Sequence, residues 1–231
     1  MKQMANTAKY FALVGSLAVC FTEGRPLLAA PRFYDRWQTF DVTNGLPSNK
    51  ALCVLATSSD IWVGTDQGLA RRTNGRWQPY TPADGIAHEA VMALAQDANT
   101  GDLWIATLGG LNRFSAGRFD RFTQLNSGLA NDVVYGVTVH DGEVWAATAA
   151  GASRYEIAKD RWTIFDESNT PMHEIWCYSV TSCADVIYLA VWGGGLLEYR
   201  GSRDGSASRR RRWKDYRDPD GEMEIDLFGR P

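Results

Sequence analysis

The chain has 231 residues, of which 45% are apolar and 22% are charged, and its formal net charge at neutral pH is −3. This is the balance of a globular protein that is long enough to bury a core. The small negative charge excludes a chain that binds nucleic acid by general electrostatic attraction.

The N-terminal 30 residues are typical of a secretory signal peptide. Lys2 and Lys9 form a basic segment, residues 10–21 are an apolar run, and residues 26–30 end in small side chains that suit cleavage. The apolar run is 12 residues long, whereas a helix needs about 20 to cross a bilayer. We therefore predict a signal peptide over residues 1–30 and no transmembrane segment after its removal.

The mature protein is then the β-rich domain of residues 31–231, located in the periplasm or secreted by a bacterium. A signal anchor or a mistaken start site is the alternative. The segment Leu17–Cys20 is a weak match to a bacterial lipid-attachment motif, because Val19 is an awkward residue before the cysteine.

A pattern with a period of about 42 residues recurs four times in this domain. In each copy an aromatic residue of a short apolar segment is followed, six or seven residues later, by Gly-Leu or Gly-Ala. The aromatic residues are spaced 42, 41 and 43 residues apart, at Trp62, Trp104, Trp145 and Tyr188. A second aromatic column runs in register at Trp37–Phe40, Trp77–Tyr80, Phe119–Phe122, Trp162–Phe165 and Trp213–Tyr216. Such a period indicates one supersecondary unit, repeated.

Each repeat reads as four short strands separated by turn residues, for example the hairpin signal Asp141-Gly142. The first strands are predicted at Ala51–Ala56, Val91–Ala95, Val133–Val139 and Ile175–Val180. The second strand is apolar or small on both faces, as expected for a sheet between two neighbouring sheets. The residue two positions after its aromatic is always small, at Gly64, Ala106, Ala147 and Ala190. We infer that an adjacent sheet packs tightly there. The predicted fold is an all-β propeller of four-stranded blades.

The motif formed by Gly45–Asn49, Ile61–Thr65 and Gly68-Leu69 resembles the two-component regulator propeller repeat. This family occurs in periplasmic sensor regions of bacterial hybrid histidine kinases and in secreted proteins. The resemblance covers roughly residues 35–228. It implies a sensor-type module that binds a saccharide or another small polar ligand, with a protein partner in signalling. It assigns no catalytic residue.

The number of blades is an open question at this stage. The repeats span about 37–76, 77–118, 119–161 and 162–212, followed by a partial repeat at 213–231. Family propellers resemble seven-bladed rings closed by an N-terminal strand. We therefore expect part of a larger ring, in which residues 37–40 are an isolated fourth strand and residues 220–227 enter a fifth blade. A self-contained four-bladed form is the alternative.

The loops that enter the first strands carry the main candidate ligand-binding residues. They are Asn49, His88, Glu89, Asn131, Asp132, His173 and Glu174. Loops at equivalent positions of a propeller converge on one face, where such side chains suit a polar ligand or a cation. Local hydrogen bonding to loop backbone is the favoured alternative.

Two further candidates, Trp176 and Trp192, stand near glycines in the fourth repeat and suit stacking on a sugar ring. For Trp192, packing in the core or a turn is favoured over ligand binding. The basic run of residues 202–212 is expected to be a solvated loop rather than a site for an anionic polymer.

No sequence motif of a nucleophile, phosphate loop, zinc site or dinucleotide site is present, so we predict no catalytic residue, metal or cofactor. Cys53 and Cys177 are expected to be buried thiols rather than part of a disulfide framework. Two other functions stay open. One is a metal-dependent lyase or hydrolase, because propeller lyases that resemble virginiamycin-inactivating enzymes use a histidine, and His88 and His173 are available. The other is a structural scaffold for protein interaction.

Overall fold

The computed structural model describes residues 37–201 and 213–216, and every structural statement below concerns these residues. The predicted signal peptide at 1–30, the basic run at 202–212 and the segment 217–231 lie outside the described residues. No helix in the described part of the chain is both long and apolar enough to cross a membrane.

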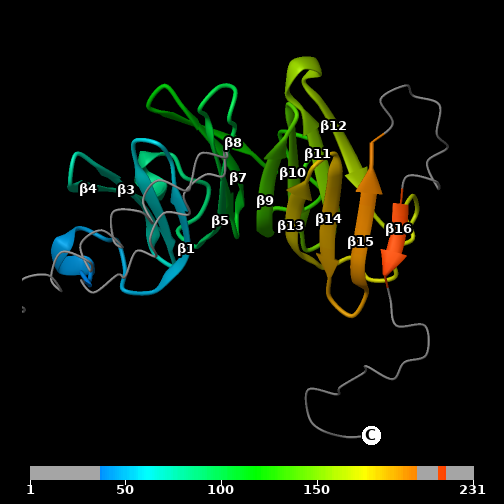
Figure 1. Cartoon of the computed structure of the whole chain (residues 1–231), viewed down its shortest axis with the longest axis horizontal. Helices are drawn as coiled ribbons and strands as arrows, with labels where there is room; N and C mark the ends of the chain where they lie inside the picture. Colours follow the sequence, from blue (N-terminus) through cyan, green and yellow to red (C-terminus); the bar gives the residue numbers. More distant parts are fainter. Residues whose placement is uncertain (1–36, 202–212, 217–231) are drawn as a thin grey trace, which may run out of the picture. The chain divides into compact units, whose positions relative to one another are not determined.

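The described chain forms four antiparallel sheets of four strands each, and every sheet is one continuous stretch of sequence (Figure 1). We call these sheets blades 1 to 4. Blade 1 consists of β1 (Ala51–Ala56), β2 (Ile61–Thr65), β3 (Gly68–Thr73) and β4 (Arg76–Tyr80). Blade 2 consists of β5 (Val91–Gln96), β6 (Leu103–Thr107), β7 (Gly110–Ser115) and β8 (Arg118–Phe122). Blade 3 consists of β9 (Val134–His140), β10 (Glu143–Thr148), β11 (Gly151–Glu156) and β12 (Arg161–Phe165). Blade 4 consists of β13 (Cys177–Cys183), β14 (Val186–Val191), β15 (Gly195–Arg200) and β16 (Trp213–Tyr216).

This architecture confirms the predicted all-β fold, the strand order within each repeat and the role of residues 213–216 as the last strand of blade 4. The first strand of blade 4 begins at Cys177, two residues later than its apolar run suggested. Three short 3-10 turns, η1 (Val42–Asn44), η2 (Pro82–Asp84) and η3 (Ile157–Lys159), are the helical elements of the described residues.

Tight turns fix the register of each blade. The predicted hairpin at Asp141-Gly142 is present, with φ of +49° and +75°, which is the left-handed pair that a two-residue hairpin turn requires. In blade 1 the hydroxyl of Thr65 closes the β2–β3 turn by donating to the carbonyl of Gly68 at 2.9 Å. Thr107 and Thr148 do the same in blades 2 and 3.

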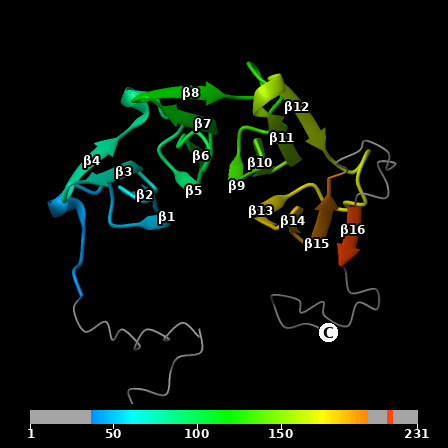
Figure 2. The ribbon, with the colours of Figure 1, turned by 45° about the horizontal axis from the view of Figure 1, so that its top comes forward.

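Consecutive blades pack face to face, and their first strands are neighbours: β1 lies beside β5, β5 beside β9, and β9 beside β13 (Figure 2). The small residue of the second strand allows this approach, as the sequence predicted. A β-carbon placed on Gly64 would lie only 2.6 Å from Cγ1 of Val91 in the next blade. In the next two interfaces Ala106 and Val134, and then Ala147 and Cys177, belong to the same buried clusters.

Aromatic rings fill the outer half of each interface. The second-strand tryptophan of one blade contacts a third-strand ring of the next, with centroids 5.3 Å apart for Trp62 and Phe114 and 5.0 Å apart for Trp145 and Tyr199. Edge-to-face and offset ring pairs of this kind add to the burial energy. Rings of the fourth strands join these pairs, as Tyr80 contacts Phe119 and Phe165 contacts Tyr199, so aromatic packing holds neighbouring blades together.

Residues 37–40, expected to be an isolated fourth strand, have no regular secondary structure. A strand is defined by hydrogen bonds to a neighbour, and no described strand pairs with this segment. Phe40 nevertheless packs edge-on against Trp77, with ring centroids 5.5 Å apart. This is the type of contact that Tyr80 makes with Phe119 in the next interface, at 5.4 Å.

Candidate functional site

The entry loops and the β2–β3-type turns lie at the same end of each blade. The start of each first strand pairs with the end of the second strand, as at Ala51 and Thr65. A backbone hydrogen bond then ties the turn to the entry loop, and in blade 4 the N–H of Trp192 donates to the carbonyl of Trp176 at 2.9 Å. Blades 1 to 3 have the equivalent bond from Asp66, Leu108 and Ala149. The two groups of candidate residues predicted from the sequence therefore share one end of the fold.

Four of the loop candidates accept hydrogen bonds from nearby backbone N–H groups, which is the local hydrogen bonding that the sequence analysis favoured. His88 accepts from the N–H of Ala90 through Nδ1 at 3.0 Å, and Asn131 accepts from the N–H of Val133 at 2.8 Å. Two others accept from the turn before the loop: Asn49 from the N–H of Val42 and Asp132 from that of Gln124. These hydrogen bonds stabilise the conformation of the loops.

Glu89 stands where Asn49 and Asp132 stand in the neighbouring blades, but it has no such bond. The donor position in its blade is Pro82, which has no N–H. The carboxylate of Glu89 is therefore exposed and makes no hydrogen bond or ion pair within the described residues.

Blade 4 departs furthest from the repeat. His173 and Glu174 are exposed and have no side-chain partner in the described residues. Trp176 and Trp192 are 48% and 53% exposed. Trp192 is thus not a core residue and lies in the turn between β14 and β15.

The local sequence explains the exposure of Trp192. Val191 replaces the threonine that closes the other three turns, and the turn of blade 4 is one residue longer, with left-handed glycines at Gly193 and Gly195. The longer turn holds Trp192 outside the sheet. A β-carbon on Gly193 would lie 3.7 Å from Cγ of Glu174, so the exposed carboxylate lies against the same turn.

Sequence reasoning missed Tyr135 and Tyr178. Their rings stack with centroids 4.7 Å apart and planes 14° apart, and Tyr178 also lies 5.4 Å from the ring of Trp192. We call Tyr135, Tyr178 and Trp192 the aromatic platform. It joins blades 3 and 4 at the end that carries His173 and Glu174.

A β-bulge produces this platform. In each first strand the ladder skips the second residue, so that Thr148 pairs with Val134 and Ala147 with Gly136, leaving Tyr135 as the extra residue. The skipped residues of the other blades are Leu52, Met92 and Tyr178. A bulge re-aims the side chain of its extra residue. The available sequence signal was a large residue at the second position of every first strand.

The described residues contain no group of three or more His, Cys, Asp or Glu side chains that could hold a metal ion. Their cysteines, Cys53, Cys177 and Cys183, are all free thiols. Burial raises the pKa of Cys177 to about 12 and that of Cys53 to about 11. These two thiols are therefore protonated and inert at neutral pH, as expected for packing residues.

No protein-family model matches the chain, and no curated protein matches its sequence. Solved structures do match. The extracellular domain of BT3049 from B. thetaiotaomicron, named as a hybrid two-component system, is 20% identical with a TM-score of 0.66, over 78% of this chain and 26% of that chain. The extracellular domain of BT4673 from the same organism, named as a one-component system, is 21% identical with a TM-score of 0.53, over 65% of this chain and 20% of that one.

The WD40 β-propeller domain of Doa1 also matches, at 13% identity and a TM-score of 0.50, over 67% of this chain and 50% of that chain. The chain thus spans about a quarter or less of the two extracellular domains and half of the third structure. At these identities the likenesses show the fold, which is a β-propeller of four-stranded blades.

Proposed function

We propose that this chain is an extracytoplasmic, sensor-type propeller module that binds a small polar ligand, a saccharide in the first place, and catalyses no reaction itself. The observation that carries the proposal is the aromatic platform, with the unpartnered carboxylate of Glu174 against the turn that holds Trp192 and the exposed His173 next to Glu174 in the chain. A pyranose ring has an apolar face that stacks on such rings, and hydroxyls that suit exposed imidazole and carboxylate groups.

The repeat itself supports this proposal. Residues that build the propeller recur from blade to blade, whereas Tyr178, Trp192 and Glu174 are exposed and contribute little to the core. Aromatic side chains that are exposed together on one surface are typical of binding surfaces. The sensor-type systems of the structural neighbours favour a role in detection, with a signalling protein as partner, in the periplasm or outside the cell.

The proposal is tested by titrating the purified chain with a panel of neutral mono- and disaccharides, followed by tryptophan fluorescence and calorimetry. Loss of one stacking contact is worth about 0.5–1.5 kcal/mol, so Trp192→Ala is expected to weaken binding roughly two- to tenfold. Trp192→Phe keeps a ring and is expected to retain most of the affinity.

Trp37→Ala is the matched control, because Trp37 is an exposed tryptophan, at 91%, outside the platform. Equal losses in the Trp37 and Trp192 variants would contradict the assignment of the platform. Metal-dependent turnover of a bound saccharide would instead favour the lyase alternative.

A further inference from the structure

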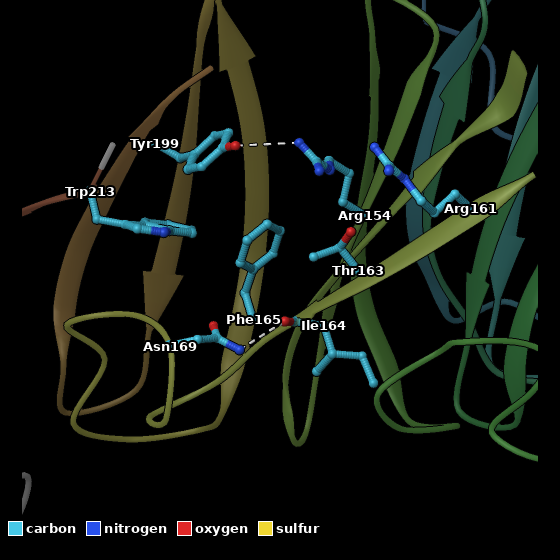
Figure 3. A pocket seen from close by; sticks show the side chains of 8 residues that line it. All are labelled: Arg154, Arg161, Thr163, Ile164, Phe165, Asn169, Tyr199 and Trp213. Carbon is cyan, nitrogen blue, oxygen red and sulfur yellow. Dashed lines mark hydrogen bonds between the residues drawn. The ribbon is translucent and has the colours of Figure 1, made fainter. Parts of the chain in front are cut away.

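A cavity of about 360 Å³ lies between the outer strands of blades 3 and 4, and the aromatic platform contributes no residue to it (Figure 3). Its lining includes Arg154, Arg161 and Thr163 of blade 3 on one side, and Tyr199 and Trp213 of blade 4 on the other. The volume is within the usual range for a small-molecule site, about 300–1,000 Å³.

Comparison of blade 3 with blade 2 shows that an arginine of this cavity lacks a carboxylate partner. Arg113 in blade 2 and Arg154 in blade 3 hold the same position of the third strand. Across the ladder Arg113 faces Asp120, whose carboxylate accepts from its Nε at 3.0 Å and its Nη2 at 2.7 Å. Arg154 faces Thr163 instead. A short neutral side chain therefore replaces the carboxylate that satisfies the arginine of blade 2.

The guanidinium of Arg154 is incompletely satisfied as a result. Its Nε is buried and has no hydrogen-bond partner. Its Nη1 donates to the hydroxyl of Tyr199 at 3.3 Å (Figure 3). Its Nη2 donates to Glu156 at 3.4 Å, and the carboxylate of Glu143 is 3.4 Å from Nη1. In blade 1 the Nε of Arg71 is likewise buried without a partner, but its Nη2 has a close carboxylate, that of Asp60 at 2.9 Å.

The two neighbouring carboxylates are also shared with other groups. Glu156 accepts from Arg161 at 2.6 Å and from Lys159 at 2.6 Å, and Glu143 accepts from the indole N–H of Trp145. Burial raises the pKa of Glu156, but the hydrogen bonds from Lys159 and Arg161 outweigh it, and the pKa lies below its ordinary value. Among the described residues, three cationic side chains thus contact these two carboxylates, an excess of one positive charge in this group.

The opposite wall is aromatic. Tyr199 and Trp213 are 4% and 8% exposed, and their ring centroids are 4.8 Å apart. Phe165, also a lining residue, lies edge-on to Trp213 at 5.3 Å. Flat apolar walls opposite a guanidinium suit a molecule with one anionic end and a ring-shaped body.

We propose that this cavity is a second binding site, which takes a small organic carboxylate with a ring: the carboxylate pairs with the guanidinium of Arg154, in the way that Asp120 pairs with that of Arg113, and the ring lies against Tyr199 and Trp213. An acidic sugar and an aromatic acid share this chemistry. The site is independent of the aromatic platform and of the function proposed for it.

The test is calorimetric titration of the full chain with D-glucuronate and with phenylacetate, each beside its neutral counterpart, D-glucose or 2-phenylethanol. At least one carboxylate is expected to bind at a 1:1 ratio, and its neutral counterpart to bind about tenfold more weakly or not at all, since hydrogen bonds to charged groups are the strong ones. Which of the two acids binds distinguishes a sugar ligand from an aromatic one.

Thr163→Asp is the decisive variant, because it places a carboxylate opposite Arg154 as in blade 2. It is expected to fold with an unchanged or higher melting temperature and to lose carboxylate affinity about tenfold or more. Thr163→Asn, of similar size but neutral, is the matched control and is expected to bind within about twofold of wild type.

Three results would overturn the proposal: binding of the neutral counterpart as tight as that of the acid, undiminished affinity in a folded Thr163→Asp chain, or no binding of either acid at about 10 mM. The first comparison needs only the wild-type chain, so a variant that fails to fold does not weaken the test.

Discussion

Gly64→Ala is the sharpest test of how neighbouring blades pack. A β-carbon at this position would lie closest to Sγ of Cys53 in its own blade, and 2.6 Å from Cγ1 and 2.8 Å from the carbonyl oxygen of Val91 in blade 2. Side-chain carbons do not approach so closely, and a carbonyl cannot rotate away, so blades 1 and 2 must separate locally. Gly64 is not among the residues with positive φ, so its own backbone accepts alanine.

The expected cost follows from two opposing effects. Overpacking of a tight core costs about 1–3 kcal/mol. Replacing glycine by alanine restricts the unfolded chain and returns about 0.4–1 kcal/mol. The free energy of unfolding should therefore fall by about 1–2 kcal/mol, which for a domain of this size lowers Tm by roughly 2–8 °C.

The cross-strand neighbour provides an internal control. Gly64 pairs with Cys53, whereas the equivalent pairs of the other blades are Ala106 with Ala93, Ala147 with Gly136, and Ala190 with Ser179. In blade 1 the first strand carries the large residue of the pair and the second strand has no side chain. Cys53→Ala alone should cost about 1 kcal/mol by leaving a small void. The double variant reproduces the pair of blade 2 and should recover at least half of the loss of Gly64→Ala.

The measurement is urea and thermal denaturation of the four chains of this double-mutant cycle. Additive losses in the double variant would show that Cys53 and Gly64 do not share one packing volume. A Gly64→Ala chain as stable as wild type would refute the tight contact between blades 1 and 2.

Two further predictions concern titratable groups. Hydrogen bonding from Arg71 lowers the pKa of Asp60 from 3.8 to about 2. The ionised carboxylate therefore stabilises the fold by about 2 kcal/mol above pH 4, and this contribution is lost as pH falls toward 2. Asp60→Asn should make the free energy of unfolding less dependent on pH between 4 and 2, and an unchanged dependence would contradict this. In a Cys20→Ser chain, a thiol reagent at pH 8 should label the exposed Cys183 quickly. Cys53 and Cys177 should be labelled only on unfolding, because burial raises the pKa of these two thiols. Rapid labelling of more than one thiol would show that the interfaces between blades open.

The sequence by itself determined the architecture, because the repeat is a local pattern. The recurring tryptophans, the glycine turns and the small position at Gly64 predict four-stranded units that stack, and each unit is one continuous stretch of chain. The first strand of blade 1 was located to the residue, at Ala51–Ala56. The likeness of the motif to sensor propellers agrees with the solved structures that share the fold.

Only the tertiary structure decided which candidates are available for binding. His88 and Asn131 stand where His173 stands in the fourth repeat, but their side chains accept hydrogen bonds from the loop backbone and that of His173 does not. That outcome depends on turn geometry, which a list of residue types does not contain.

The sequence also did not predict which side chains of different repeats would be in contact. Tyr135 and Tyr178 are 43 positions apart and meet because bulges in neighbouring first strands turn both rings to the same surface. Arg154 acquires its unpaired Nε because the ladder sets it opposite Thr163 rather than opposite an acid. A period in the sequence predicts that such units exist. Register between strands and packing between blades decide which side chains then face one another, and only a folded chain has both.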